Sequence, residues 1–390
     1  MHVNRSPFLS AASSADPGRS YGILSTYPPT PCGLATFTAA LTRGLEANGA
    51  AVGIVRVADG TSSSDARIVS ELDNNVPASA AEAATRLSDC DMAIVQHEYG
   101  LYGGHDGDEV LDILCGLTVP SIVVAHTVLL APTEHQQQVL ESVTAAASVV
   151  VVMTDAARQR LCSRFDVDPS KVVMIPHGAA TPPPRVPYDG STGPVLLTWG
   201  LIGRGKGIEW AIDAMVDLQD LRPRPRYVVA GRTHPKVLAF EGEVYRDMLV
   251  ERARTNQVAA SVSFDSGYRD LASLTDLIQD AAVVVLPYDS RDQVTSGVLV
   301  DAIAAGRPVV ATAFPHAVEL LSSGAGIVVP HGDAAALAAA LRRVLTEPGL
   351  AAAMAGEAAR LAPTLGWPAV ADQYASLAER ILSAPEPVPA

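Results

Sequence analysis

A glycine-rich stretch in the middle of the chain carries two cations in a pattern suited to binding an anion. Residues 195–199 are apolar, residues 200–207 contain four glycines together with Arg204 and Lys206, and helical spacing follows. This order predicts a strand, a glycine loop and the start of a helix. Glycines let backbone N–H groups approach an anion, and a helix N-terminus faces it with about half a positive charge. The loop is therefore predicted to bind a phosphate or diphosphate.

The same loop nearly matches the P-loop of nucleotide hydrolases. Gly200, Gly205 and Lys206 fit the spacing G-x-x-x-x-G-K, but Gly207 stands where a Ser or Thr would hold Mg²⁺. Loss of that hydroxyl removes a metal ligand that an NTPase normally needs. The sequence thus disfavours an NTPase. A glycine-rich turn with solvated cations and no ligand remains the alternative to an anion-binding loop.

A second polar segment follows another apolar stretch, and a helix is predicted to begin at about Ser296. The first-turn amides of such a helix lack intrahelical partners and can bind an anion. Asp301 lies about one turn inside, where its carboxylate could accept hydrogen bonds from two sugar hydroxyls. A helix cap with a surface aspartate is the alternative interpretation.

Polar residues also follow two apolar strands in the first half of the chain. His97 and Glu98 follow the strand predicted at 92–96, and His126 ends the strand predicted at 120–125. Because they follow a strand, His97 or Glu98 could meet a ligand there, with an ordinary loop as the alternative. His126 could accept a hydrogen bond from a ligand as neutral imidazole, and a capping or core histidine is its alternative.

The run Asp106-Gly107-Asp108 has the form of a metal-binding DxD motif. It stands at the start of a predicted helix, where N-capping explains it. We therefore predict that the protein requires no metal.

These residues must be positioned by alternating strands and helices, which predict parallel sheets in two doubly wound α/β domains. Residues 59–77 are predicted to be irregular and residues 241–256 to form one helix. Ligands are expected beyond the carboxyl ends of the strands, in a cleft between the domains. The predicted organisation is a disordered leader (1–18), an N-terminal Rossmann-like domain (19–180), a proline-rich linker (181–187), a C-terminal Rossmann-like domain (188–365), a final helix (366–383) and a tail (384–390).

Composition excludes several classes of partner. The net charge of −14 argues against nucleic acid, because phosphate-backbone binding needs a basic face. No apolar run approaches the roughly 20 residues of a membrane span, which leaves peripheral membrane contact open. The four scattered cysteines form no metal-binding spacing and predict a reducing, cytoplasmic location. Nothing in the sequence indicates an oligomeric state.

Taken together, three segments resemble the family 4 retaining glycosyltransferases of GT-B architecture. They are the glycine loop, the stretch from Gln293 to Asp301 with its following Gly306-Arg307-Pro308, and the Pro28-Pro29 to Gly33 loop before a helix. The resemblance covers about residues 20–383. It implies two Rossmann-like domains facing each other across a cleft, with the C-terminal helix crossing back to the first domain.

The resemblance also implies an activity. Such an enzyme moves a hexose from a nucleoside diphosphate sugar to a saccharide or other hydroxyl acceptor, with retention at the anomeric carbon. The nucleotide sugar is then a substrate, and no cofactor is expected. The base, the sugar and the acceptor are not identified, and mannose or glucose is only a mild preference.

Site roles follow from the resemblance, position by position. Catalytic roles fall on His126, Lys206 and Arg204, donor binding on Gly33, Gly203, Gly205, Arg232, Gln293, Thr295, Ser296, Gly297 and Asp301, and acceptor or sugar binding on His97 and Glu98.

The chain departs from the family pattern at two places. Leu201 stands where the family commonly has an arginine, so either Arg204 or Arg232 replaces that cation or Lys206 holds the diphosphate largely alone. Gln293 and Asp301 stand where the family has paired glutamates. Gln293 keeps hydrogen bonding but loses the charge, which disfavours a carboxylate nucleophile at that position.

Other activities remain alternatives at this level. A GT-B-like sugar-nucleotide epimerase or phosphorylase would use the same donor site. A sugar-nucleotide-binding protein without activity would also be compatible with Gln293 and Leu201. A dehydrogenase is least favoured, because no G-x-G-x-x-G opens either predicted domain.

Overall fold

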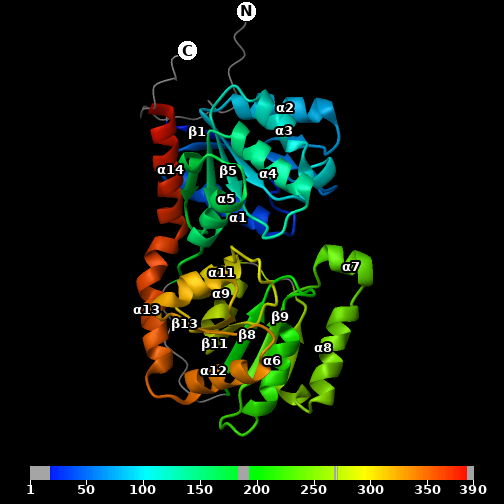
Figure 1. The fold of residues 1–390 in the computed structure, drawn as a ribbon, viewed down its shortest axis with the longest axis vertical. Helices are drawn as coiled ribbons and strands as arrows, with labels where there is room; N and C mark the ends of the chain where they lie inside the picture. The colour runs from blue at the N-terminus through cyan, green and yellow to red at the C-terminus, as the bar shows by residue number, and fades with distance from the viewer. Residues whose placement is uncertain (1–17, 183–192, 268, 270, 384–390) are drawn as a thin grey trace, which may run out of the picture. The chain divides into compact units, whose positions relative to one another are not determined.

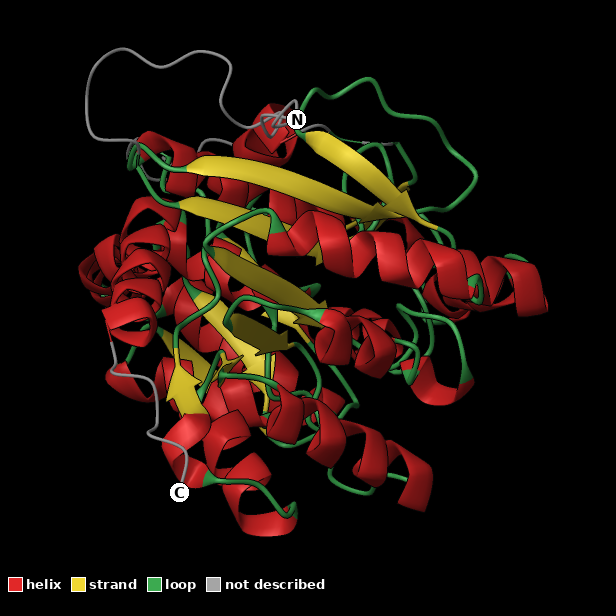
Figure 2. Cartoon of the chain, turned by 90° about the horizontal axis from the view of Figure 1, so that it is seen from above, coloured by secondary structure: helices red, strands yellow, loops and turns green. Residues whose placement is uncertain are grey.

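The computed structural model describes residues 18–182, 193–267, 269 and 271–383 (Figure 1). The chain forms two compact units, of which unit 1 comprises residues 1–178 and 367–390 and unit 2 comprises residues 179–366. Each unit is a parallel sheet with helices packed against it, as the strands and helices of Figure 2 show. The predicted class, two doubly wound α/β domains, is confirmed. The predicted leader and tail, and most of the predicted linker, lie outside the described residues.

Unit 1 contains a seven-stranded parallel sheet in the order β3-β2-β1-β4-β5-β6-β7. Its strands are β1 (Ser20–Ser25), β2 (Ala51–Val57), β3 (Ile68–Leu72), β4 (Met92–His97), β5 (Ser121–Ala125), β6 (Val149–Val152) and β7 (Val172–Met174). Its α-helices are α1 (Gly33–Ala47), α2 (Pro77–Ser88), α3 (Val110–Gly116), α4 (Glu134–Ala146), α5 (Asp155–Arg164) and α14 (Trp367–Ser383), and its short 3-10 helices are η2 (His105–Gly107) and η3 (Pro169–Lys171).

Unit 2 contains a six-stranded parallel sheet in the order β10-β9-β8-β11-β12-β13. Its strands are β8 (Val195–Trp199), β9 (Arg226–Ala230), β10 (Val262–Asp265), β11 (Val283–Leu286), β12 (Val309–Thr312) and β13 (Gly326–Val329). Its α-helices are α6 (Ile208–Ala214), α7 (Pro235–Glu241), α8 (Val244–Thr255), α9 (Leu271–Asp280), α10 (Gly297–Ala304), α11 (Pro315–Leu320), α12 (Ala334–Thr346) and α13 (Leu350–Leu365), and its 3-10 helices are η4 (Met215–Leu218), η5 (Ala259–Ser261) and η6 (Leu321–Ser323).

The strand order of each sheet fixes where a ligand can enter. In unit 1 the order reverses between β1 and β4, and in unit 2 it reverses between β8 and β11. At such a reversal the loops after the two strands diverge and leave a crevice at the carboxyl ends. The loops after β1, β4, β8 and β11, which carry most of the predicted site residues, therefore lie at the switch point of their own sheet, whereas His126 follows β5 and Arg232 follows β9.

Two details of the sequence-based prediction are wrong. The stretch 59–77 is not wholly irregular, because β3 pairs with β2 at its edge of the sheet. The helix predicted at 241–256 is α8, but the sequence missed α7, which precedes it and ends at Glu241, before Gly242 with φ +65°. β3 is only half-buried, which weakens its apolar pattern.

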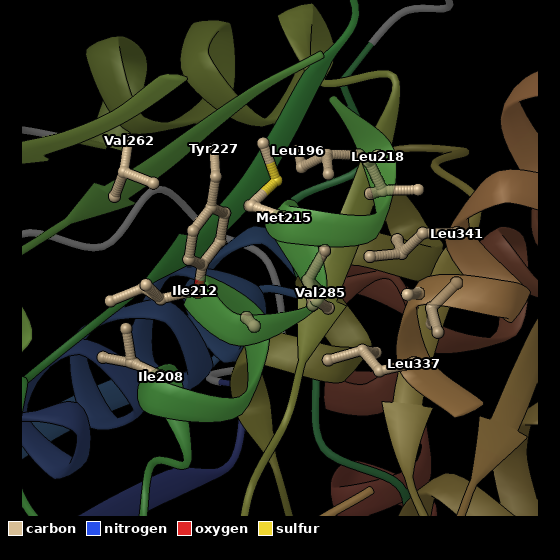
Figure 3. Close-up of a cluster of buried hydrophobic side chains, with 14 of the residues drawn as sticks. Leu196, Ile208, Ile212, Met215, Leu218, Tyr227, Val262, Val285, Leu337 and Leu341 are labelled. Carbon is tan, nitrogen blue, oxygen red and sulfur yellow. The ribbon is translucent and has the colours of Figure 1, made fainter. Parts of the chain in front are cut away.

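The core of unit 2 lies between its sheet and the helices α6 and α12. Ile212 and Met215 pack against Tyr227 of the sheet, and Leu337 of α12 belongs to the same buried cluster (Figure 3). Tyr227 is 1% exposed, and its hydroxyl donates to Thr198 Oγ1 at 2.8 Å. Burial of this apolar face fixes the start of α6 against the sheet, which positions the glycine loop before it.

In unit 1 the last helix of the chain packs on the first. α14 contacts α1 along its length, and Asn48 at the end of α1 donates to Asp372 at 2.7 Å. Val370 and Tyr374 of α14 are completely buried in the core of unit 1. Among the described residues, no helix combines the length and the apolar character needed to cross a membrane.

Candidate functional site

The glycine loop after β8 is shaped by backbone that only glycine adopts easily. Gly207 has φ +61°, and a Cβ built on it would lie 1.8 Å from the carbonyl oxygen of Pro287. A Cβ on Gly231, after β9, would lie 1.9 Å from the carbonyl oxygen of Gly200. The loops after β8, β9 and β11 thus approach one another so closely that a side chain is excluded.

Lys206 lies in the middle of this loop and is mostly withdrawn from solvent. Its Nζ lies 4.5 Å from the centroid of the Tyr288 ring, a cation–π contact. Burial lowers the pKa of the Lys206 ammonium, because the charged form is poorly solvated there. A desolvated cation of this kind binds a phosphate more strongly than a hydrated one would.

Arg204 turns away from Lys206 to a surface ion pair. Its Nε and Nη2 bond the carboxylate of Glu241 on α7 at 3.0–3.2 Å, and its side chain is 61% exposed. An exposed ion pair contributes little to stability, so Arg204 can leave Glu241 at small cost when an anion binds. Arg232 is exposed, and its carbonyl accepts from Ile202 N at 2.8 Å.

The loop after β11 is fastened to the glycine loop and to the next two strands. Asp289 N donates to Gly205 O at 3.0 Å, and Trp210 Nε1 donates to Asp289 Oδ1 at 2.8 Å. The carbonyl of Tyr288 accepts from Thr312 Oγ1 at 2.6 Å and from His331 Nδ1 at 2.8 Å. These bonds hold Tyr288 under Lys206.

The start of α10 offers fewer free amides than the sequence predicts. Ser296 N donates to Nδ1 of the buried His316 at 2.9 Å, and Ser296 Oγ accepts from Leu299 N at 3.3 Å. Since the first four amides of a helix lack intrahelical partners, the donors left for an anion are those of Gly297 and Val298. His316 is a site residue that sequence reasoning missed. Its position just after β12, in the first turn of α11, was the available signal.

Two side chains of the same loop support a ligand site there. Gln293 Nε2 donates to the carbonyl of Thr295 at 3.1 Å, so its amide oxygen faces away from that bond. Thr295 Oγ1 is buried and has no hydrogen-bond partner among the described residues. A buried hydroxyl without a partner is costly, and a bound ligand would satisfy it.

Asp301 lies in the first turns of α10 beside a small pocket. The pocket is mostly apolar, and its lining residues are Ala180, Pro182, Leu274, Thr275, Ile278, Asp301 and Ala305. Burial raises the pKa of the Asp301 carboxyl to about 7. When it is ionised, the Asp301 carboxylate can accept hydrogen bonds, as the predicted contact with two sugar hydroxyls requires.

In unit 1, Gly33 begins α1 and borders open space. An added Cβ at Gly33 would meet no atom within 4 Å, and Cys32 caps the helix by accepting from Ala35 N at 3.4 Å. The N-terminus of α1 at Gly33 therefore has space beside it for a ligand.

A buried arginine that sequence reasoning missed holds the loop before Gly33. Arg56 of β2 is fully buried, and its guanidinium donates to Tyr27 O at 3.3 Å and to Thr30 Oγ1 at 3.0 Å. Two carboxylates, Asp59 at 2.6 Å and Glu71 at 2.7 Å, balance its charge. Its place in an apolar strand was the only signal, because a charge there needs buried partners.

His126 follows β5 as expected and is set up as a neutral imidazole. Its Nε2 donates to Gln96 Oε1 at 2.6 Å, and its ring meets Phe37 edge-on at 5.0 Å. Burial, with smaller effects of His177 and His97, lowers the pKa of His126 to about 3. With the proton on Nε2, Nδ1 is left as an acceptor for a hydroxyl group.

His97 and Glu98 are adjacent in sequence but differ in access to solvent. His97 ends β4, is 1% exposed, and has both ring nitrogens without partners among the described residues. Burial lowers its pKa to about 4. Glu98 is half-buried and accepts a hydrogen bond from the hydroxyl of Thr127. Of the two residues, Glu98 is therefore the one that can meet a ligand directly.

Parts of the chain are similar in sequence to known proteins. Residues 193–347 match the family model for glycosyl transferases group 1. The D-inositol 3-phosphate glycosyltransferase of Kineococcus radiotolerans is 32% identical over 263 residues, which are 61% of this chain and 57% of that protein. The glycogen synthase of Mycobacterium tuberculosis is 34% identical over 191 residues, 48% of this chain and 42% of that protein. The chain thus spans about half the length of these curated relatives.

Solved structures with a similar fold include a sugar-bound protein. HepE of Anabaena, solved in complex with UDP and glucose, superposes with a TM-score of 0.73 over 93% of this chain and 100% of that one, at 16% identity. Likeness at this identity concerns the fold alone. The chain has the GT-B fold, and its residues 193–347 match the family model for glycosyl transferases group 1.

Proposed function

We propose that the protein is a retaining glycosyltransferase that moves a hexose from a nucleoside diphosphate sugar to a hydroxyl acceptor. The observation that carries the proposal is Lys206, a desolvated cation over Tyr288 in a glycine loop that closes on the loop after β11. The matched family and the glycosyltransferase relatives support it. HepE binds UDP and glucose, which makes UDP-hexoses the first donors to test.

In the proposed reaction, the bond between the anomeric carbon and the diphosphate breaks and a bond to the acceptor oxygen forms on the same face. Negative charge that develops on the leaving diphosphate is stabilised by Lys206 and by the amides of Gly297 and Val298. The acceptor proton passes to the leaving phosphate. Asp301 binds the ribose, and Thr295 and Gln293 meet the distal phosphate and the sugar.

For unit 1 we assign His126 and Glu98 to hydroxyl groups of the sugar or the acceptor. Nδ1 of neutral His126 accepts one hydroxyl hydrogen bond, and the Glu98 carboxylate accepts another. Gly33 at the start of α1 is assigned to the donor phosphates. We expect the reaction to need no cofactor, since the nucleotide sugar is itself consumed.

Replacing Lys206 tests the proposal most directly. K206A should lower turnover of a nucleotide sugar by about 100-fold or more, since loss of one preorganised donor to a developing anion costs that much. K236A removes an exposed lysine and should leave turnover unchanged. Nucleotide release is measured with and without acceptor, after thermal-shift screening of UDP, GDP and ADP sugars identifies the donor.

The same measurements separate the alternatives. Near-normal transfer by K206A would contradict the assignment of the leaving-group cation. Nucleotide release that does not depend on acceptor, with interconversion of the sugar, would indicate an epimerase. Tight nucleotide binding without transfer to any acceptor would indicate a binding protein. NMR of the product distinguishes retention from inversion at the anomeric carbon.

A further inference from the structure

Two histidines and an aspartate gather on the surface of unit 1, in a part of the chain that the proposed transfer does not use. His105 and Asp106 belong to η2, and His135 is the second residue of α4. One ligand atom of each lies within 4.8 Å of the ligand atoms of the other two. We propose that these three side chains bind a divalent transition-metal ion of the zinc type.

The spacing of the donor atoms fits such an ion. Asp106 Oδ2 lies 3.1 Å from His135 Nδ1 and 3.6 Å from His105 Nδ1. Ligands about 2.0–2.1 Å from a tetrahedral zinc ion are about 3.4 Å from one another. The two separations from Asp106 bracket this value, and the two histidine ligand atoms lie within 4.8 Å of each other.

The chemistry of the ligands selects the class of metal. Two imidazole nitrogens and one carboxylate oxygen suit zinc and its neighbours in the transition series, whereas Mg²⁺ and Ca²⁺ prefer oxygen ligands alone. Three protein ligands leave a fourth position for water. The charge of Asp106 also offsets the positive end of α4, which would otherwise oppose a cation.

Groups around the three ligands hold them in place. Asp108 Oδ2 lies 3.6 Å from Nε2 of His135, the ring nitrogen that the metal does not use, as in carboxylate–histidine–metal arrangements. Gln136 Nε2 donates to Asp106 Oδ1 at 3.2 Å, which leaves Oδ2 for the ion. Gln136 is itself fixed, because its Oε1 accepts from Thr133 N at 3.0 Å in a capping box.

The backbone at Asp106 also fits this reading. Asp106 has φ +53°, a left-handed conformation that is unfavourable for most residues other than glycine. N-capping does not explain it, because α3 has Glu109 at its N-cap and no side-chain cap bond. The capping role predicted for Asp106 and Asp108 from the sequence is therefore wrong. The carboxylate of Asp106 points instead to α4.

Binding would clamp η2 to the start of α4. The segment between them includes β5 and His126, while η2 follows the loop that begins at Glu98. The ion is thus inferred to be structural. It supplies no step of the proposed transfer, so the prediction of metal-independent transfer stays as it is.

The test measures zinc binding by the full chain, produced without a histidine tag and stripped with chelator. Competition with a chromophoric chelator should give one Zn²⁺ per chain. H135A and D106N should each lower the affinity by more than about 100-fold, and D108N by about tenfold, as losses of inner and outer ligands do. Asparagine is chosen at 106 because it tolerates the left-handed backbone.

Two matched controls exclude other sources of binding. E134Q changes the acidic neighbour of His135 and should leave the affinity unchanged. C115S removes an exposed thiol and should also leave it unchanged. Zinc affinity that survives H135A and D106N, or that is lost in C115S, overturns the proposal, as does the absence of micromolar binding by the unsubstituted protein.

A second readout does not depend on the folding of any variant. Co²⁺ bound to the unsubstituted protein should give the visible d–d absorption of a four- or five-coordinate ion without a thiolate charge-transfer band. A thiolate band would place the metal on cysteine and overturn the assignment. His105 has a side chain that is 74% exposed, so H105A should lose affinity while its circular dichroism spectrum stays unchanged.

Discussion

Asp301 places an ionisable carboxyl group beside a mostly apolar pocket, and its charge state depends on pH near neutrality. Burial raises the pKa of Asp301 to about 7 in the folded protein, from 3.8 in an unperturbed aspartate. Between these values the unfolded chain has lost the proton and the folded protein retains it. The stability that protonated Asp301 contributes at low pH is therefore lost as pH rises from about 4 to about 7. No further loss from this group occurs above that range.

D301N removes this titrating group, so it tests whether the Asp301 carboxyl lowers the stability of the protein as pH rises. The melting temperature of D301N minus that of the unsubstituted protein should increase between about pH 4 and about pH 7 and then stay constant. D217N, at an exposed aspartate of the same unit, serves as the control. Thermal melts at several pH values measure the difference. The same difference at both ends of the range would show that Asp301 ionises as an ordinary aspartate does.

Single residues differ in how far sequence reveals them. The place of Lys206 in a loop between a strand and a helix was predictable, because the glycines that shape the loop are its neighbours in sequence. Arg56 and His316 were not, since their partners come from other elements: Tyr27 and Thr30 for Arg56, and the Ser296 amide for His316. A side chain whose function depends on partners distant in sequence gives no local pattern.

The loops after β8 and β11 in unit 2 pack directly against each other, because glycine allows their backbones to come into contact. Gly205 and Gly207 both have positive φ, +84° and +61°. Only at Gly207 would a side chain also meet another loop, the one that carries Tyr288. Backbone strain and loop-to-loop contact can therefore be separated at these two positions.

G205A and G207A should differ in both stability and ligand binding. G205A should cost about 1–2 kcal/mol, the price of a left-handed alanine. G207A should cost more and should also weaken nucleotide binding, because the Cβ displaces Pro287 and with it the partner ring of Lys206. Chemical denaturation and nucleotide titration measure the two effects. Equal losses in both variants would show that the contact between the loops is unimportant.

Helices and strands could be predicted from the sequence where burial produces a clear pattern of apolar residues. All residues of β4 and β5 are buried, and such strands read as continuous apolar runs. β3 lies at the sheet edge and is half-exposed, so its sequence resembles a loop. α7 was missed for a similar reason, because none of its residues is buried and no apolar face marks it.

At the scale of the whole molecule, unit 1 is completed by the far end of the chain. α14 buries Val370 and Tyr374 in the core of unit 1, although residues 179–366 form unit 2 in between. The seam between α14 and α1 includes Gly44, where an added Cβ would lie 2.6 Å from Cβ of Ala371 and 3.3 Å from the carbonyl oxygen of Trp367. Close approach of these helices thus depends on the absence of a side chain at Gly44.

Alanine substitutions at two helical glycines should therefore act in opposite directions. G356A, at an exposed position of α13 where an added Cβ meets nothing within 4 Å, should stabilise unit 2 by up to about 1 kcal/mol through helix propensity. G44A gains the same propensity but should destabilise unit 1, because α14 must move away. Hydrogen exchange followed by mass spectrometry should then show faster exchange in α1 and α14 only.

The double variant G44A/A371G decides whether the contact between the two helices is the cause. Removing the Ala371 methyl makes room for the new one, so the two substitutions together should destabilise unit 1 by less than the sum of their separate effects. A371G alone should cost about 1 kcal/mol in helix propensity. Strictly additive effects, or a stabilising G44A, would mean that α14 is not held by close packing at Gly44. Favourable coupling, seen in exchange from both helices, would establish that unit 1 depends on residues from both ends of the chain.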